Sequence, residues 1–253
     1  MNMPMANPES KNEKLLLLAL AVANEIMRNG GETNRAEESA RRILSSGNAE
    51  EIEIFAIPTS ILITAVFKNE VITRSVSVRD RDINLGNIDV LNTISRNISS
   101  GKLTVEQAFL QLEKLYKKPA NAYLLGFFSS VSSGAFSALF GGGLIDVGLS
   151  FLAALATNVS IKIFKKTTGY SFLTALFASI LTAIFARVAV FFVPQANLPA
   201  LIIGGIMPIL PGLSFTNAVR DTINGDIVSG SSKGTEAALQ AVAIAVGVGI
   251  ALI

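Results

Sequence analysis

Charged side chains are scarce in the second half of this sequence, and the few that occur are the strongest candidates for chemistry. Residues 119–253 contain six Lys or Arg and four Asp or Glu, whereas residues 1–118 contain fifteen of each. Ionisable residues at membrane depth are costly and are often functional, as ion or solute sites. The candidates for a transport path, with the backbone-breaking residues near them, are Asp146, Arg187, Pro208, Pro211, Gly212, Arg220, Asp221 and Asp226.

Asp146 and Arg187 each fall inside a long apolar run. Asp146 follows three glycines and is expected in the first turn of a helix, where a carboxylate suits the helix dipole. It could instead be an ionisable gate or a proton-carrying acid that lines a cavity. Arg187 is expected roughly 24 Å from the inner end of its span. It either extends to lipid headgroups or faces the bundle, where it would favour a solute with a carboxylate.

The stretch GIMPILPG at residues 205–212 interrupts an apolar helix with two prolines. Proline has no backbone N–H, so Pro208 and Pro211 leave the carbonyls of residues 204 and 207 without their usual helical donors. Irregular backbone at membrane depth occurs where it is buried or lines a cavity, and transporters use such breaks to bind solutes and ions. The alternative is a helix that ends there, followed by a solvated Arg220–Asp221 pair.

Composition excludes several kinds of chemistry. The chain has no cysteine and no histidine, so disulfides, thiolate metal sites and histidine proton switches are absent. Any proton coupling must therefore use carboxylates. We predict no metal site and no cofactor, and a net charge of +2 gives no indication of a nucleic-acid partner.

The first half has the patterns of a water-soluble α+β domain. Residues 15–23 resemble a secretory signal, but we interpret them as the core of a soluble helix, because Ser10 and Glu13 form a capping box. A second capping box lies at Thr104 and Gln107, and Thr33 is expected to cap the second helix. The expected helices are 12–29, 34–46, 85–99 and 104–117, and the expected strands are 52–57, 61–67 and 71–78, with a turn at 68–70.

The second half contains five apolar runs of about the length that a bilayer requires. They cover residues 120–140, 144–161, 171–193, 198–213 and 235–253. We predict a membrane protein with a cytoplasmic α+β domain (1–118) followed by an all-α bundle of five transmembrane helices (119–253). Basic residues in alternate loops place the N-terminal domain in the cytoplasm and the C-terminus outside; they are Lys114, Lys117, Lys118, Lys162, Lys165, Lys166, Arg220 and Lys233.

Two of these runs carry small residues at every fourth position, which indicates close helix packing within or between chains. They are Ser129, Ser133, Ser137 and Gly141 in the first run, and Ala237, Ala241, Ala245 and Gly249 in the last.

Several short motifs in one order resemble the threonine/serine exporter (ThrE) family, from about residue 15 to the end. The chain is most similar in layout to the YjjP-type subunit of two-component (YjjP/YjjB) exporters. The motifs are GGETNR (30–35) with Glu37, FAIPT (55–59), Thr73-Arg74, FGGG (140–143) with Asp146, GIMPILPG (205–212), AVRD (218–221) and Gly225-Asp226.

The resemblance implies a bacterial inner-membrane exporter that is driven by an ion gradient rather than by ATP. Long members of the family fuse this half to a second membrane half, so the resemblance implies a separate four-span companion subunit, or a homo-oligomer, as the partner. Fused members are associated with threonine and serine, and the split pair with succinate and related dicarboxylates. No residue of this sequence chooses between these solutes.

The motif residues of the soluble half have two interpretations. They could form a salt-bridged junction between the second helix and the sheet, or a vestibule that gathers solute or docks the membrane half. These residues are Glu32, Arg35, Glu37, Thr59 and Arg74.

We therefore expect a transporter subunit in the membrane lipid that exports small polar metabolites of the threonine/serine type, with dicarboxylates as the alternative. We expect Arg220, Asp221 and Asp226 at the cytoplasmic mouth of the path, and no enzyme activity. Two rival functions are an accessory scaffold for the companion subunit and a membrane-anchored enzyme. The enzyme is disfavoured because no nucleophile elbow or metal-ligand spacing occurs.

Overall fold

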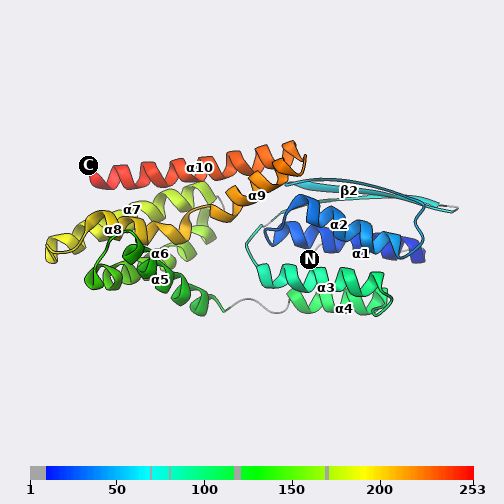
Figure 1. The fold of residues 1–253 in the computed structure, drawn as a ribbon, viewed down its shortest axis with the longest axis horizontal. Coiled ribbons are helices and arrows are strands. Elements are labelled where there is room, and N and C mark those ends of the chain that lie inside the picture. Colours follow the sequence, from blue (N-terminus) through cyan, green and yellow to red (C-terminus); the bar gives the residue numbers. More distant parts are fainter. Residues whose placement is uncertain (1–9, 69, 80, 117–120, 169–170) are drawn as a thin grey trace. The chain divides into compact units, whose positions relative to one another are not determined.

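The protein folds into two compact units. A computed structural model describes residues 10–68, 70–79, 81–116, 121–168 and 171–253 (Figure 1). Unit 1 comprises Met1–Pro119 and Leu213–Gly234, and unit 2 comprises Ala120–Gly212 and Thr235–Ile253. The predicted division into a cytoplasmic domain (1–118) and a transmembrane domain (119–253) stays a prediction.

Unit 1 consists of helices around a small sheet. Its elements are α1 (Lys11–Arg28), α2 (Thr33–Ser45), β1 (Glu51–Ile57), β2 (Ser60–Phe67), β3 (Glu70–Ser77), α3 (Leu85–Ser99), α4 (Val105–Tyr116), most of α9 (Gly212–Ile223) and the start of α10 (Ile227–Leu252). The strands form an antiparallel sheet in the order β1-β2-β3, and Thr64 and Thr73 are joined across it by a hydrogen bond of 3.0 Å. Asn69, in the expected turn, lies outside the described residues.

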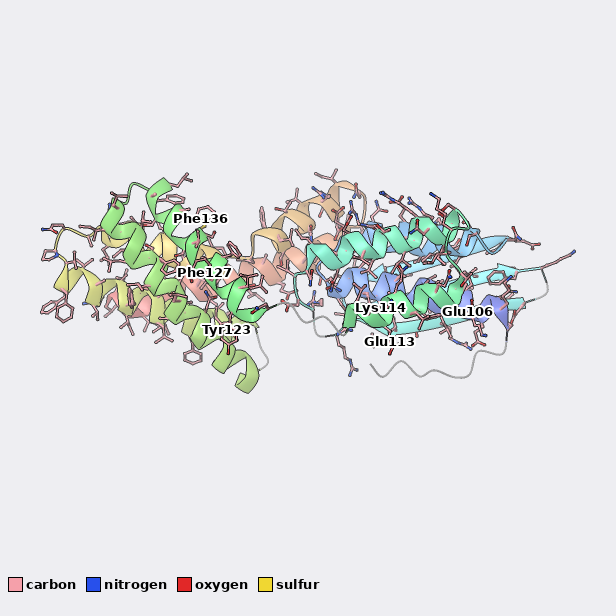
Figure 2. All side chains as sticks on the ribbon, turned by 90° about the horizontal axis from the view of Figure 1, so that it is seen from below. Glu106, Glu113, Lys114, Tyr123, Phe127 and Phe136 are labelled. Atoms are coloured by element: carbon pink, nitrogen blue, oxygen red, sulfur yellow. The ribbon has the colours of Figure 1, made fainter. Side chains whose placement is uncertain are left out.

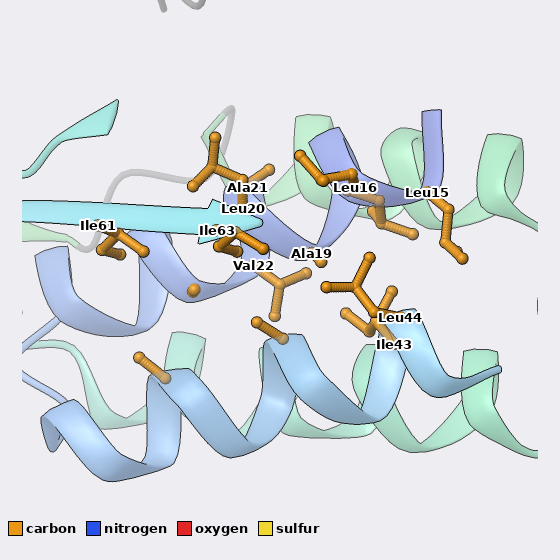
Figure 3. Packing of buried hydrophobic residues seen from close by; sticks show 14 of the residues in the cluster. Leu15, Leu16, Ala19, Leu20, Ala21, Val22, Ile43, Leu44, Ile61 and Ile63 are labelled. Atoms are coloured by element: carbon orange, nitrogen blue, oxygen red, sulfur yellow. The ribbon is translucent and has the colours of Figure 1, made fainter. Parts of the chain in front are cut away.

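The apolar run at residues 15–23 forms the centre of this unit. It lies in α1, which begins where the Ser10 hydroxyl accepts the Glu13 N–H at 3.1 Å. Leu16, Leu18 and Val22 are fully buried, and Figure 3 shows the run facing side chains of α2 and β2. Burial of each large apolar side chain contributes about 1.5–3 kcal/mol. The interpretation of this run as a core helix is confirmed.

The first turns of α3 and α4 are both fixed by capping residues in the local sequence. Asn84 accepts the Asn87 N–H at the start of α3. Before α4, the Thr104 N–H donates to Gln107 Oε1 at 3.0 Å and the Gln107 N–H donates to Thr104 Oγ1 at 3.3 Å. The predicted second capping box is therefore confirmed.

Unit 2 is helical, and it buries polar side chains and exposes apolar ones, which is the reverse of a water-soluble domain. Its elements are α5 (Ala122–Leu139), α6 (Leu144–Thr168), α7 (Ser171–Phe192), α8 (Leu198–Ile206), the 3₁₀ turn η1 (Met207–Ile209) and α10 from Thr235 onward. In α5, Ser133 and Ser137 are fully buried, whereas Tyr123 and Phe127 are 85% and 50% exposed. Figure 2 labels the aromatic side chains of α5 and the charged side chains of α4. Buried hydroxyls and exposed aromatic residues are typical of helices that face lipid.

Two helices among the described residues are long and apolar enough to cross a membrane, at Phe172–Phe192 and Ile227–Leu252. A third candidate is the bent pair Leu198–Ile209 and Gly212–Ile223, while Tyr123–Leu139 and Leu144–Asn158 are shorter apolar helices. The chain therefore has the helices of a membrane protein, and the count of five spans stays a prediction. Lys117 and Lys118, which served for orientation, lie outside the described residues, as do the side chains of Lys162, Lys165 and Lys166.

Candidate functional site

A buried ion pair joins the two helices of segment 213–234 in unit 1. The Lys233 ammonium lies 2.7 Å from Asp221 Oδ2, and the two side chains are 10% and 0% exposed. Asp221 comes from α9 and Lys233 from the second turn of α10. A buried charge is costly unless it is paired and hydrogen-bonded, so each residue requires the other.

The loop before α2 completes the hydrogen bonds of this pair. Thr33 donates its N–H to Asp221 Oδ1 and its hydroxyl to Asp221 Oδ2, both at 3.3 Å. Lys233 also donates to the Gly31 carbonyl and to Thr33 Oγ1, each at 3.3 Å. The expectation that Thr33 caps α2 is wrong. Glu32 occupies the cap position and makes no capping hydrogen bond, whereas Thr33 is the first residue of the helix and its hydroxyl donates to Asp221.

Backbone geometry explains the two glycines in this loop. Gly30 has a φ of +82°, which favours glycine. A Cβ on Gly31 would lie 2.8 Å from the Ile26 carbonyl oxygen. The loop therefore turns tightly at the end of α1 and presents the Gly31 carbonyl to Lys233.

A second set of contacts surrounds the buried pair. Arg220 forms an ion pair with Glu32, in which the Arg220 side chain is 54% exposed. Asn217 donates to the Gly30 carbonyl at 2.9 Å. Asp226 precedes α10 and caps its first turn, where its Oδ1 accepts the Ser229 N–H at 3.0 Å. Motifs about 190 residues apart in sequence thus meet in one polar cluster, which we call the Asp221 cluster: Gly31, Glu32, Thr33, Asn217, Arg220, Asp221, Asp226 and Lys233.

Glu37 lies beside this cluster and has a perturbed acidity. Its Oε1 accepts the Ala56 N–H of β1 at 3.2 Å. Burial raises the pKa of the Glu37 carboxyl, and the nearby carboxylates of Asp226 and Asp221 raise it further. The Ala56 hydrogen bond and Arg41 act in the opposite direction.

The remaining motif residues of the soluble half lie elsewhere. Arg35 is exposed on α2, and Thr59 is exposed in the β1–β2 turn, where its carbonyl accepts the Val78 N–H. Arg74 of β3 forms an ion pair with Glu13 in the first turn of α1. The structure therefore joins Glu32 and Glu37 with the Arg220–Asp226 region, but not Arg35, Thr59 and Arg74. The sequence analysis missed the role of Lys233. The one feature that could have indicated it is that Lys233 is an isolated basic residue next to the apolar run at residues 235–253.

In unit 2, each carbonyl that the two prolines deprive of a donor has another partner. The Ser133 hydroxyl of α5 lies 2.7 Å from the Gly204 carbonyl, and the Leu210 N–H donates to the Met207 carbonyl at 3.2 Å. Gln240 of α10 donates to the Ile209 carbonyl at 3.1 Å. The helix breaks after Ile206 and resumes at Gly212. Its irregular backbone is thus held by polar side chains inside the bundle.

Small residues make this arrangement possible. A Cβ on Gly204 would lie 2.8 Å from both the Ser133 carbonyl oxygen and Ser137 Cβ, so α5 and α8 touch at backbone distance. In α10, by contrast, Ala243 and Gly247 are buried while Ala241, Ala245 and Gly249 are exposed. The α5 stripe packs within the chain, whereas most of the α10 stripe faces outward from the chain.

Asp146 lies in the first turn of α6 and is 4% exposed. Its Oδ2 accepts the Gly143 N–H at 2.8 Å, and its Oδ1 accepts the Asn197 N–H at 2.7 Å. Asn197 in turn caps α8 by accepting the Ala200 N–H. Asp146 therefore ties the beginnings of α6 and α8 together.

Arg187 of α7 donates to the Ala251 carbonyl at 2.8 Å, in the last turn of α10. A cation is favourable at a helix C-terminus, where carbonyls lack helical donors. The contact gives Arg187 a structural partner inside the bundle.

Similarity to known proteins indicates the family of this chain. The chain is 21% identical over 248 residues to a protein of Mycobacterium tuberculosis (strain ATCC 25618 / H37Rv) named "Probable threonine/serine exporter". The match covers 94% of this chain and 46% of that protein, so the chain spans about half the length of this relative. No solved structure matches the chain. The family described as "Putative threonine/serine exporter" matches residues 17–253, and the chain therefore belongs to the threonine/serine exporter family.

Proposed function

We propose that this protein is a subunit of a bacterial inner-membrane secondary transporter that exports small polar metabolites of the threonine/serine type. Unit 1 lies in the cytoplasm and the C-terminus lies outside. The observation that carries the proposal is the broken helix at residues 206–212, which is held by Ser133 and Gln240 inside a bundle of apolar helices. Transporters bind solutes at such breaks because the backbone there is free of helical hydrogen bonds.

The side chains near the break favour a zwitterionic solute over a dicarboxylate. Helices α5 and α8 contain no Lys or Arg. The single cation of α7, Arg187, already donates to the Ala251 carbonyl. Hydroxyls and carbonyls suit the ammonium and hydroxyl groups of threonine or serine, which carry one carboxylate. A dicarboxylate carries two carboxylates and no ammonium, so it would depend more on cations to replace its hydration. Succinate and related dicarboxylates remain the alternative that the experiment below tests.

The polar residues of unit 1 support a transporter rather than an enzyme. Asp221 and Lys233 are buried and fully engaged with each other and with Thr33. We propose that the Asp221 cluster holds segment 213–234 in a fixed conformation and is not a mouth for solute. Arg220, which is exposed, remains the residue of this cluster that solute could meet.

A separate membrane subunit is proposed as the partner. The family relative is about twice as long, since the match covers 46% of it. A four-span companion subunit would supply the remaining membrane helices, and a homo-oligomer of this chain is the alternative.

The test is efflux of labelled threonine, serine and succinate from loaded cells. Each solute is measured with this chain alone, with the presumed companion alone, and with both. We expect threonine and serine efflux only with both proteins. Efflux of succinate alone would overturn the choice of solute, and efflux of none, with both proteins confirmed in the membrane, would overturn the proposal.

Variants separate a pathway from a scaffold. Asp146→Asn should reduce efflux at unchanged expression. Asparagine has only one side-chain oxygen, so it cannot replace the two oxygens with which Asp146 accepts the Gly143 and Asn197 N–H groups. Pro208→Ala with Pro211→Ala should also reduce efflux if the break lines the path. If complex assembly and efflux both survive these changes, the chain is a scaffold for its partner.

A further inference from the structure

A groove in the surface of unit 1 is separate from both the Asp221 cluster and the broken helix. Its volume is about 460 Å³, which lies within the range of about 300–1,000 Å³ that is usual for sites of small molecules. The described residues that line it are all charged or carry a hydroxyl, so the groove suits a small polar solute. They are Glu38, Arg41, Arg42, Ser45, Ser46 and Ser99.

The groove lies where two parallel helices end. Ser45 is the last residue of α2 and Ser99 is the last residue of α3, and both line the groove. About one turn earlier, the Ser95 hydroxyl of α3 donates to the Ser39 carbonyl of α2 at 3.4 Å. The helices therefore run side by side in the same direction. Each helix C-terminus carries about half a negative charge, so two such ends favour a cationic group nearby.

Three charged side chains of α2 border the same groove. Arg42 forms an ion pair with Glu38 one turn earlier, and these side chains are 36% and 64% exposed. Arg41 Nη1 donates to the Ile52 carbonyl of β1 at 2.7 Å. A guanidinium group has five N–H donors, so both arginines keep donors for a ligand. Glu38 and the two helix ends balance the two guanidinium charges, which favours a ligand that carries both signs of charge.

The three serine hydroxyls of the groove act as acceptors. Each donates its proton to a backbone carbonyl three or four residues earlier, at 2.9 Å for Ser45, 2.6 Å for Ser46 and 2.9 Å for Ser99. The oxygen lone pairs remain for a donor from outside the chain. An ammonium group has three N–H donors, whereas an ionised carboxylate has none. The hydroxyls therefore suit the cationic part of a ligand.

We propose that this groove binds a free α-amino acid. Its carboxylate lies against Arg41 and Arg42, and its ammonium lies against Glu38 and the serine hydroxyls. An α-amino acid carries both charged groups on one carbon, and the groove has partners for both within the last two turns of α2 and the end of α3. A dicarboxylate has no ammonium, so its second carboxylate would meet Glu38 and hydroxyl acceptors.

Binding in this groove does not rest on the proposed function. The groove belongs to unit 1, whereas Ser133 and Gln240, which hold the broken helix, belong to unit 2. In an exporter of amino acids, the groove would be a second place at which the protein meets its solute, and its occupancy would act as an effector signal. That role, unlike the binding, rests on the proposed function.

The experiment measures binding of labelled threonine to the purified full chain in lipid nanodiscs by equilibrium dialysis, with empty nanodiscs as the blank. We expect saturable but weak binding, because the charged groups of the groove are exposed to water. Unlabelled serine should compete, and succinate should not. Two analogues test the two charges: 3-hydroxybutyrate lacks the ammonium, and threoninol lacks the carboxylate. Both should compete weakly.

Variants locate the binding in the groove. Arg42→Gln and Glu38→Gln should each raise the Kd for threonine about fivefold, because each removes a charged partner. Ser99→Ala removes one acceptor and should also raise the Kd. Ser100→Ala is its matched control, because Ser100 likewise donates to a backbone carbonyl three residues earlier, at 3.3 Å, but is not among the lining residues. Arg35→Gln, on the exposed surface of α2 outside the groove, is the control for Arg42→Gln.

The outcomes separate this inference from the proposed function. Absence of threonine binding, or equal binding by the groove variants and their controls, overturns the site. Efflux of threonine that persists in cells, together with either of these results, leaves the exporter intact. Binding that the groove variants weaken and the controls retain, by a chain that exports none of the solutes with its companion, supports the site and overturns the proposed function. Competition by succinate as strong as that by serine overturns the choice of an amino acid.

Discussion

Replacement of Lys233 by methionine should strongly destabilise unit 1. Lys233→Met keeps the length and the apolar stem of the side chain but removes the ammonium that lies 2.7 Å from Asp221. The Asp221 carboxylate, which is 0% exposed, would keep only the two donors of Thr33. A buried charge without its partner is the expected cause of the loss.

The magnitude follows from the burial of the pair. Removal of one partner from a buried ion pair costs about 3–5 kcal/mol. That is a large part of a total stability of about 5–15 kcal/mol. At about 2–4 °C per kcal/mol for a unit of this size, the unfolding temperature should fall by roughly 6–20 °C.

The same segment supplies a matched control. Arg220 is next to Asp221 in sequence, and its partner Glu32 is next to Thr33, but the Arg220 side chain is 54% exposed. An exposed pair contributes about 0–1 kcal/mol, so Arg220→Met should have little effect. The assay is thermal unfolding of the purified full chain in detergent, followed by circular dichroism.

A double variant tests the electrostatic cause. Asp221→Asn with Lys233→Met removes both charges and leaves an oxygen that can accept from Thr33. It should recover most of the stability that Lys233→Met loses. Equal effects of Lys233→Met and Arg220→Met, or no recovery in the double variant, would refute the reasoning.

Two other stability predictions concern single positions. Gly204→Ala should destabilise unit 2 by about 1–3 kcal/mol, because the new Cβ would clash with the α5 backbone. Gly249→Ala is the control, because a Cβ at that position has open space around it and should not destabilise the unit. The unfolding temperatures of the two variants test this difference. The raised pKa of Glu37 means that its stabilising contribution is full below the unfolded-state pKa and is lost as pH rises through the folded-state pKa. Glu37→Gln should therefore reduce the fall in stability as the pH rises above the ordinary glutamate pKa of about 4, and an unchanged pH profile would contradict the assignment.

Local signals in the sequence were sufficient for most of unit 1. Helix α1 was predicted to within one residue at each end, because a capping box, an apolar run and two glycines mark its start, body and end. The strands were predicted to within one residue because alternation along β3 and the apolar run of β2 are visible without tertiary context.

Contacts between distant segments were beyond the reach of these signals. Thr33 has the sequence context of a helix cap, and only the presence of Asp221, 188 residues away, explains why its hydroxyl is used elsewhere. Lys233 was interpreted as a basic residue of the loop before the last span, which was predicted to begin at residue 235. The structure places Lys233 inside α10, which begins at Ile227, and pairs it with Asp221.

The candidate site in the membrane half was partly predictable. The positions of the prolines identified the carbonyls of residues 204 and 207 as the ones that lose helical donors, and both have replacement partners. The identity of those partners was not predictable, because Ser133 stood out only as one of several small residues in a stripe. The burial of Asp146 and its contact with the Asn197 N–H were likewise beyond prediction from the sequence.

The buried Asp221–Lys233 pair gives segment 213–234 a specific alignment that an apolar contact would not. A pair of well-packed apolar side chains is often as stable as a buried ion pair or more stable. Such a pair, however, tolerates shifts of one helix along the other, whereas Asp221 must meet the Thr33 N–H, the Thr33 hydroxyl and the Lys233 ammonium together. The end of α9, the start of α10 and the loop before α2 can therefore satisfy one another in one register.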